Sequence, residues 1–229
     1  FARLAIHLGK PSHIVGITGS HGKSSTRNSL HAALSRIFVT KTVFEGNSET
    51  GIPLGLLGIS PKNYSFFDWV RLFILCPFRI GHLIGIELVI IEMGIDDPYE
   101  PKNMEYLLTI VEPDICIFLN VHPVHTQQFE KKLSNKTYDE KNYTSRVLAE
   151  IAREKAKLIT KNSRCHTAIY NADNEFVVAE IEKYKHISAS NISYFAFGKD
   201  IKNTIAVQKT TQTLSGTTMS FMYNVPSGD

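Results

Sequence analysis

The sequence predicts an α/β protein with a doubly wound, mostly parallel sheet, a phosphate-binding loop and a small antiparallel β flank near the C-terminus. Three observations lead to this prediction. Apolar runs of strand length recur along the chain and alternate with helical patterns. The first run leads through a glycine-rich turn into a helix. The last stretch is rich in β-forming residues and has no helical pattern between its strands.

The first expected elements surround the glycine-rich turn. An apolar strand covers His13–Thr18, and the following helix begins near Lys23 and runs through Leu34 with apolar residues at helical spacing. Phe38–Val43 reads as a second strand, and a loop with several glycines and prolines continues to Pro61. The order strand, helix, strand is typical of a parallel sheet.

The middle of the chain continues the same alternation. Glu87–Glu92 and Asp114–Leu119 are continuous apolar runs, as expected of parallel strands that are buried on both faces. Met104–Val111 between them reads as a helix. A further strand over Thr167–Tyr170 precedes a helix over Glu175–Tyr184. These elements complete the predicted doubly wound sheet.

Two regions depart from this alternation. Ser193–Phe197, Ile205–Val207 and Thr217–Tyr223 form the expected antiparallel flank, and Pro226–Asp229 resembles a hairpin that has been cut open. The polar, lysine-rich segment Lys131–Lys141 is expected to be an exposed insertion.

Composition limits the class of protein. A chain of 229 residues with 43% hydrophobic and 21% charged residues can bury the core of one large domain. The net charge is +3 and the basic residues are scattered, so we expect no nucleic-acid partner. Three widely separated cysteines without a CxxC pair fit a reducing compartment.

The most apolar region, Phe66–Met93, is interrupted by charged residues and by Pro77, so it is too short to span a bilayer. Within it, Phe67–Ile74 has two interpretations. It is either an interfacial membrane helix or a helix packed on the sheet. We favour packing on the sheet, because one buried apolar face accounts for the pattern, and we expect no stable insertion into a membrane.

The turn ITGSHGKSST over Ile17–Thr26 predicts a nucleoside triphosphate site. Gly19 and Gly22 allow backbone conformations in which successive N–H groups turn toward an anion, and the helix N-terminus adds its dipole. Lys23 would reach the β- and γ-phosphates, and the Ser24 hydroxyl would hold magnesium. The expected nucleotide contacts in this loop are Thr18, Gly19, Ser20, His21, Gly22, Lys23, Ser24 and Ser25.

The spacing of this turn differs from the usual Walker motif. Ile17 occupies the position where the motif has its first glycine, and Gly16 lies one residue too early. The alternative interpretation is a glycine-rich turn that only joins a strand to a helix and binds no nucleotide. Because Gly-Lys-Ser lies between a strand and a helix, as phosphate binding requires, we favour a nucleotide site.

A TGxxGK[ST] sequence after an apolar strand resembles the ATP loop of the Mur ligase family, the ATP-dependent ligases of peptidoglycan precursor synthesis. Further segments resemble the branch that attaches D-alanyl-D-alanine to a UDP-muramoyl-tripeptide. They are Gly46–Leu54, Glu92–Asp96, Asn120–His125 and Asn171–Asn174. The resemblance implies that residues 1–229 are the central ATPase domain of a longer protein, without the family's N-terminal substrate domain and C-terminal amino-acid-binding domain.

The resemblance also implies a reaction and its participants. ATP would phosphorylate a substrate carboxylate to an acyl phosphate, which an amine then attacks to form an amide. The implied cofactors are ATP and Mg²⁺, and the implied partners are a UDP-muramoyl-peptide and an amino acid or dipeptide. We expect a cytoplasmic monomer that binds ATP but ligates little as this fragment.

Several polar residues follow the strands, where open α/β sheets bind ligands. By resemblance, Glu92 and His125 hold divalent metal ions together with Ser24. Glu92 can also be interpreted as a solvated carboxylate at the end of a strand. His125 can also be interpreted as a packed or surface histidine, and we favour this interpretation for His122. Asn120 would orient the loop or contact the nucleotide, or cap the strand.

Lys155 resembles the lysine that many Mur ligases carbamoylate to form a magnesium ligand. This chemistry needs a neutral amine, which burial would favour by lowering the lysine pKa. Lys157 is a competing assignment, and an ordinary helix lysine is the other interpretation. Asn171 and Asp173 resemble adenine-side residues, or they form an Asx turn with helix capping. Lys23, His125 and Lys155 are thus the expected catalytic residues.

Two other classes of function remain open. One is a different ligase of the same superfamily, such as a folylpolyglutamate or cyanophycin synthetase. The other is a non-catalytic P-loop module that uses ATP as a switch.

Overall fold

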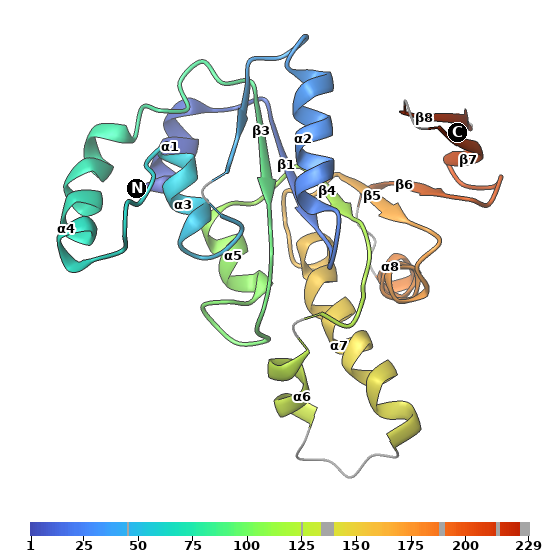
Figure 1. Cartoon of the computed structure of the whole chain (residues 1–229). Coiled ribbons are helices and arrows are strands. Elements are labelled where there is room, and N and C mark those ends of the chain that lie inside the picture. The colour runs from blue at the N-terminus through green and yellow to red at the C-terminus, as the bar shows by residue number, and fades with distance from the viewer. Residues whose placement is uncertain (45, 125, 134–139, 188–190, 214–215, 225–229) are drawn as a thin grey trace.

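The computed structural model describes residues 1–224 except 45, 125, 134–139, 188–190 and 214–215. Its centre is an eight-stranded sheet in the order β2-β3-β1-β4-β5-β6-β7-β8 (Figure 1). Neighbouring strands pair in parallel except for β7 and β8. The strands are β1 (His13–Thr18), β2 (Thr40–Thr42), β3 (Leu88–Glu92), β4 (Ile115–Phe118), β5 (Thr167–Asn171), β6 (Ser193–Gly198), β7 (Ile205–Thr213) and β8 (Gly216–Tyr223).

Helices connect the successive strands from β1 to β6, as the alternation predicted. Their termini carry local signals: Gly22 begins α2 in the left-handed conformation, and the Asn103 side chain accepts a hydrogen bond from Tyr106 N at the start of α5. The helices are α1 (Ala2–Gly9), α2 (Lys23–Leu34), α3 (Gly51–Leu56), α4 (Phe66–Leu75), the 3₁₀ helix η1 (Cys76–Arg79), α5 (Met104–Ile110), α6 (Gln127–Leu133), α7 (Glu140–Thr160) and α8 (Glu175–Ile187).

The sheet is covered on both faces, because successive strand residues point to opposite sides. Val15 and Ile17 of β1 belong to a small apolar cluster with Leu30 and Leu34 of α2. Ile14 belongs to the larger cluster on the other face, which includes residues of α1, α3, α5, α7 and α8. This two-sided arrangement confirms the predicted doubly wound fold.

Gly16 lies in the middle of β1 and is close to a neighbouring loop. A Cβ atom added there would lie 2.5 Å from Pro113 Cγ and 3.2 Å from Met93 Sδ. Contacts at the shorter distance do not occur between real carbon atoms without a shift of the neighbours. Gly16 therefore has a packing role in this sheet, which accounts for a glycine one residue before the position in the Walker motif.

We expect Gly16→Ala to lower the free energy of unfolding by about 1–3 kcal/mol, because the added methyl group overpacks the core beside Pro113. Urea denaturation measures this change. Gly81→Ala is the matched control, since its added Cβ meets only Ile84 Cδ1 at 3.4 Å, and we expect it to stay within about 0.5 kcal/mol of the native chain. Equal effects of both substitutions would contradict the packing role.

The predicted antiparallel flank is only partly correct. β6 pairs in parallel with β5, from Thr167 opposite Ser193 to Asn171 opposite Phe197. The reason is that α8 connects the two strands as a crossover, which returns the chain in the same direction. Only β7 and β8 are antiparallel, over registers such as Ile205 with Tyr223. The expected cut hairpin at Pro226–Asp229 lies outside the described residues.

Two other boundaries differ from the predictions. β2 covers only Thr40–Thr42, so Phe38 and Val39 lie before the strand. Part of the expected insertion Lys131–Lys141 is helical: α6 contains the exposed Lys131, and α7 begins at Glu140. The residues 134–139 between them lie outside the described residues.

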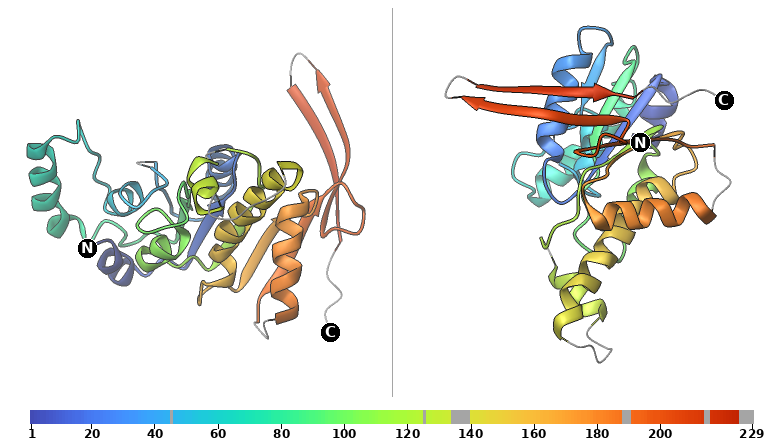
Figure 2. Two further views of the ribbon diagram at one scale, coloured as in Figure 1. Left: turned by 90° about the horizontal axis from the view of Figure 1, so that it is seen from below. Right: turned by 90° about the vertical axis from the view of Figure 1, so that its right-hand side faces the viewer.

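The predicted packing of Phe67–Ile74 is only partly correct, because Leu72 belongs to the main core cluster and Trp69 packs against it, but the helix does not lie on the sheet. A helix forms there as α4, but it lies beyond α1 and α3 at one end of the molecule, with the β7–β8 hairpin at the other end (Figure 2). Only one narrow side of α4, with Asp68 and Leu72, is buried. Within the described ranges, no helix has both the length and the apolar character required to cross a bilayer.

Candidate functional site

The carboxyl ends of the central strands bring the predicted polar residues to one edge of the sheet. Ile17 pairs with Glu92 of β3, and Thr18 pairs with Phe118 of β4, two residues before Asn120. A cleft of about 150 Å³ opens beside these ends. Its lining residues are Gly19, Ser20, Lys23, Asn47, Gly94, Ile95, Asp96, Val124, Phe129, Ile151 and Lys155.

The turn between β1 and α2 has the conformation expected of a phosphate-binding loop. Gly19 has φ +152° and Gly22 has φ +84°, which residues with a Cβ atom rarely adopt. A Cβ on Gly19 would also lie 2.9 Å from Leu119 Cβ. Gly22 is the N-cap of α2, so the first-turn amides of α2 have no acceptor within the helix and are available to an anion.

Asn120 braces this loop. Its Oδ1 accepts hydrogen bonds from the backbone N–H groups of Ser20 at 3.1 Å and His21 at 2.9 Å, and its Nδ2 donates to the His21 carbonyl at 3.1 Å. Ser20 Oγ accepts from His122 N at 2.9 Å and lies 3.2 Å from His122 O. The His122 ring is near the His21 ring, with centroids 5.5 Å apart. The side chain of Asn120 thus holds the shape of the loop.

Lys23 points back across the loop from the first residue of α2. Its Nζ donates to Gly19 O at 2.6 Å and to Ser20 O at 3.3 Å. Burial lowers the pKa of Lys23, and the nearby carboxylates of Glu92 and Asp96 partly oppose this effect. The ammonium group is therefore held over the space enclosed by the loop.

Glu92 is buried at the end of β3 and has two partners from α2. Ser24 Oγ donates to Oε2 at 3.1 Å, and Arg27 Nη1 lies 2.7 Å from Oε1. The Arg27 guanidinium lies over the Phe44 ring, 4.3 Å from its centroid. Glu92 is therefore not a solvated strand-end carboxylate, since its charge is paired inside the protein.

The oxygen atoms around Glu92 suit magnesium, which prefers hard oxygen ligands and few protein carboxylates. The Ser24 hydroxyl and the Glu92 carboxylate are adjacent. Thr18 Oγ1 is buried and has no hydrogen-bond partner among the described residues. The same described part of the chain contains no group of three or more His, Cys, Asp or Glu side chains suited to a metal ion. His125 lies outside the described residues, so its predicted role stays a prediction.

Lys155 reaches the site from α7 on the opposite side. The residue is buried, and its Nζ donates to Gly19 O at 3.4 Å. Burial, together with the nearby Lys23 ammonium, lowers the pKa of Lys155 to about 7, although Asp96 and Glu154 act in the other direction. A substantial share of Lys155 is therefore neutral near pH 7.

Lys157 lies elsewhere on α7. Its Nζ pairs with Glu154 at 2.7 Å and with Glu105 at 3.6 Å. Lys157 is not among the residues that line the cleft, whereas Lys155 is. The geometry therefore favours Lys155 over Lys157 as the lysine of the site.

The residues after β5 form an Asx turn. Asn171 Oδ1 accepts from Asp173 N at 2.9 Å, and Asp173 Oδ1 accepts from Lys199 N at 2.9 Å. Asn174, not Asn171 or Asp173, caps α8 by accepting from Val177 N at 3.2 Å. Beside this turn lies a cavity of about 390 Å³, lined by Val121, His122, Pro123, Leu148, Asp173, Asn174, Glu175 and Phe176.

Three residues of the site were not singled out from the sequence. Arg27 pairs with Glu92 across 65 positions of the chain, Asp96 lines the cleft near both lysines, and Asn47 accepts from Gly94 N at 2.9 Å through its backbone oxygen. Asp96 and Asn47 lie inside segments that resemble the family, which was the available signal. Nothing in the local sequence indicated Arg27.

A larger cavity of about 610 Å³ lies at the other edge of the sheet, between α1 and α5. Its lining includes the basic residues Arg3, His7, Lys10 and Arg164, but no residue of the phosphate loop. The strand ends that carry Glu92 and Asn120 lie at the opposite edge. This cavity is therefore separate from the candidate site.

The parallel sheet and the glycine loop before α2 define an α/β domain of the P-loop class, in which Lys23 and Lys155 meet at the loop. The profile of the Mur ligase middle domain matches residues 17–140, more than half of the chain. The chain therefore belongs to the Mur ligase family.

Two relatives illustrate the similarity. The chain is 28% identical to the UDP-N-acetylmuramoyl-tripeptide--D-alanyl-D-alanine ligase of Borreliella burgdorferi, over 80% of this chain and 30% of that protein. It is 25% identical to the ligase of the same name from Synechocystis sp., over 84% of this chain and 33% of that protein. The chain thus spans about a third of the length of these relatives.

Solved structures show the same fold. The MurF ligase from Thermotoga maritima in complex with ADP matches 96% of this chain and 40% of that chain, with a TM-score of 0.64 and 22% identity. MurF from Acinetobacter baumannii matches 97% of this chain and 41% of that chain, with a TM-score of 0.58 and 17% identity. At these identities the likeness confirms the fold.

Proposed function

We propose that this chain is the ATP-binding part of an ATP-dependent ligase that forms an amide bond through an acyl phosphate. The observation that carries the proposal is the meeting of Lys23 and Lys155 at the phosphate loop, where the side-chain nitrogens of both residues donate to the Gly19 carbonyl. Lys23 supplies a cation for the clustered negative charge of the phosphates. Lys155, from a separate helix, supplies an amine of lowered pKa at the same carbonyl. Ser24, in the first turn after the loop, donates to Glu92 at 3.1 Å.

ATP is proposed to bind with its phosphates against the loop. The first-turn amides of α2 and the Lys23 ammonium would contact the β- and γ-phosphates. Ser24 and Glu92 would hold Mg²⁺, which would offset the phosphate charge when bound. The adenine is proposed to lie in the 390 Å³ cavity beside Asp173, because this cavity adjoins the loop through His122.

Lys155 is proposed to react with CO₂ to form a carbamate. The neutral amine attacks the carbon of CO₂, a C–N bond forms, and the amine loses a proton, so that a cation becomes an anion. Its buried amine is suited to this step, because its pKa of about 7 leaves a neutral fraction at physiological pH. The carbamate would supply a further oxygen ligand near Lys23.

In the proposed reaction a substrate carboxylate oxygen attacks the γ-phosphorus, and the bond to the bridging oxygen of ADP breaks. An amine then attacks the acyl phosphate carbon, and inorganic phosphate leaves to give the amide. Lys23 would stabilise the transferring phosphoryl group by its charge, while Asn120 keeps the loop in place.

The substrates are proposed from the relatives. Their names describe ligation of D-alanyl-D-alanine to a UDP-N-acetylmuramoyl-tripeptide. We propose the same substrates in the cytoplasm for a protein of which residues 1–229 form the central domain. We further propose that the chain is a monomer, and that the remaining parts of such a ligase bring the two substrates to this cleft.

Replacement of Lys23 by alanine is expected to weaken Mg²⁺-dependent ATP binding by about a hundredfold, because a charge-assisted contact to the phosphates is lost. Isothermal titration calorimetry measures this change. Lys161→Ala, which removes an exposed lysine outside the cleft, should bind ATP as the native chain does. Equal affinity of the native chain and Lys23→Ala would refute the phosphate-loop assignment.

The ligation step needs a separate measurement. Residues 1–229 joined to the remaining two thirds of a relative should convert ATP, UDP-muramoyl-tripeptide and D-alanyl-D-alanine into ADP, phosphate and the amide product. Mass spectrometry of the product and of Lys155 would follow both the amide and the carbamate. ATP binding without any amide product would favour a nucleotide-dependent switch instead.

A further inference from the structure

The side of α4 and η1 that faces away from the core is apolar throughout. Each side chain that these two helices expose is hydrophobic or proline, and Phe67 and Phe78 are 82% and 80% exposed. We call this surface the apolar face. It consists of Phe66, Phe67, Val70, Phe73, Ile74, Pro77 and Phe78.

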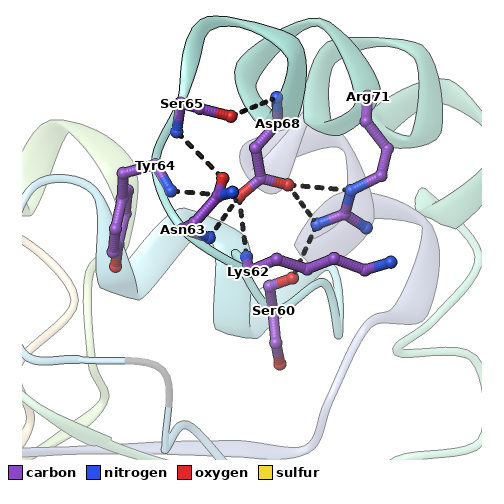
Figure 3. A network of polar contacts seen from close by, with 7 residues as sticks. All are labelled: Ser60, Lys62, Asn63, Tyr64, Ser65, Asp68 and Arg71. Atoms are coloured by element: carbon purple, nitrogen blue, oxygen red, sulfur yellow. Dashed lines mark hydrogen bonds and ion pairs between the residues drawn. The ribbon is translucent and has the colours of Figure 1, made fainter.

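The buried side of α4, by contrast, carries a charged group. Asp68 Oδ2 accepts backbone hydrogen bonds from Lys62 at 2.7 Å, Asn63 at 3.1 Å and Tyr64 at 3.2 Å (Figure 3). Asp68 Oδ1 accepts from Arg71 Nε at 2.8 Å and Nη2 at 2.6 Å. Burial raises the pKa of Asp68, but these hydrogen bonds outweigh it and hold the pKa well below its usual range.

This network fixes the direction in which the apolar face points. Ser65 caps α4 by accepting from Asp68 N at 3.4 Å, and Arg71 also donates to Ser60 O at 3.0 Å. Both ends of the loop over residues 60–65 are thereby tied to the first two turns of the helix (Figure 3). The apolar face therefore points outward because the other side of α4 carries these polar contacts and packs Leu72 into the core.

Basic residues outnumber acidic ones around the apolar face, although Glu49 lines the cavity beside Phe73. Residues 60–86 contain Lys62, Arg71 and Arg79 but only one acidic residue, Asp68, which pairs with Arg71. Arg79 lies at the base of η1 and donates to Leu57 O and Gly58 O. A protein surface with excess positive charge beside exposed phenylalanines is complementary to a partner that offers both anionic groups and hydrocarbon.

The position of α4 also indicates that its binding partner is a broad, deformable surface and not a single helix of another protein. α4 projects at one end of the molecule (Figure 2). The cavity beside it, between α3 and α4, measures only about 180 Å³, which is smaller than ordinary ligand pockets of roughly 300–1,000 Å³. A projecting apolar ridge inserts into a bilayer interface without needing a matching groove.

We propose that the apolar face of α4 and η1 binds the interface of an anionic phospholipid bilayer, with its phenylalanine side chains at the level of the upper acyl chains and Lys62 and Arg79 near the headgroups. This binding is peripheral, and it concerns a surface that shares no residue with the nucleotide site. A result that contradicts the ligase proposal therefore does not contradict this one, and the reverse also holds.

Vesicle flotation of the native chain tests the proposal. Vesicles made of equal parts phosphatidylcholine and phosphatidylglycerol should carry the chain, and vesicles of phosphatidylcholine alone should carry less. Higher salt should weaken the binding, because it screens the headgroup charge. Trp69 is the only tryptophan and lies half-buried in α4, so its fluorescence should shift to shorter wavelength when anionic vesicles are added.

The double variant Phe67→Ser/Phe73→Ser should bind anionic vesicles about tenfold more weakly or worse, because two phenylalanines no longer enter the acyl region. Both side chains are exposed, so folding and ATP binding should remain. The matched control, Ile37→Ser/Ile201→Ser, removes two exposed isoleucines elsewhere and should bind as the native chain does.

Three results would overturn the proposal. The first is that the native chain floats with neither vesicle type, and the second is that the phenylalanine double variant binds as well as the native chain. The third is self-association in analytical ultracentrifugation that the double variant abolishes, without vesicle binding. That last result would make the apolar face an interface between two copies of the chain.

Discussion

Replacement of Lys155 by methionine is expected to raise the free energy of unfolding by about 3–5 kcal/mol near pH 7. The reason is that folding lowers the pKa of Lys155 from about 10.5 to about 7, and each pKa unit corresponds to about 1.4 kcal/mol. Methionine retains the aliphatic part of the side chain without the buried charge. Urea denaturation in CO₂-free buffer measures the difference.

The sign of the pH dependence follows from proton binding. An unfolded lysine holds its proton up to about pH 10.5, whereas folded Lys155 releases it at about pH 7. Between these values the unfolded state binds more protons, so the stability of the native chain rises with pH. The advantage of Lys155→Met should therefore be constant below pH 7 and shrink steadily toward pH 10.5.

Lys161→Met is the control for Lys155→Met, because Lys161 is exposed. We expect this control to stay within about 0.5 kcal/mol of the native chain at each pH. A stability gain of Lys155→Met that does not change between pH 7 and pH 10 would show that the effect comes from packing. It would also remove the argument for a neutral amine in the proposed carbamate reaction.

The second large effect is expected for Glu92→Gln. The change removes the charge that pairs with Arg27, whose side chain is only 12% exposed, and leaves a nearly buried cation without its partner. We expect a loss of about 3 kcal/mol in the free energy of unfolding. The Mg²⁺-dependent part of ATP binding should fall by about tenfold or more, because the proposed metal loses its carboxylate ligand.

The double variant Arg27→Met/Glu92→Gln separates these two effects. Removing the unpaired cation should recover most of the stability, because buried ion pairs are often replaceable by apolar residues of similar size. The Mg²⁺ dependence of ATP binding should stay lost. Normal Mg²⁺ dependence in both variants, measured by calorimetry at several Mg²⁺ concentrations, would exclude Glu92 as a metal ligand.

The sequence alone was sufficient for the parts of the fold whose signals are local. His13–Thr18 is a mostly apolar segment of strand length, and Gly19 and Gly22 mark the turn before α2, so the strand, the turn and the helix could be predicted from the sequence. The same holds for β3 and β4, which are short apolar runs buried on both faces. These features depend on residues that are close together in the chain, so their patterns can be recognised without a structure.

Direction and exposure depend on distant parts of the chain. The β-rich pattern of Ser193–Phe197 is the same in a parallel and an antiparallel strand, and only the crossover through α8 makes β6 parallel. The apolar spacing of α4 is likewise the same whether its apolar side faces a core or solvent. The structure places the Asp68 network, which joins a loop to the helix, and the core residue Leu72 on the side opposite the exposed face.

The sequence determined the family, the doubly wound sheet, the glycine-rich turn before α2 and the strand ends at which the candidate residues lie. The tertiary structure decided which of those residues meet. It placed Lys155 against Gly19, gave Glu92 a partner in Arg27 and kept Lys157 with Glu154. The physical reason is that a lowered pKa or a buried ion pair results from packing between helices and strands far apart in the sequence, which no local pattern encodes.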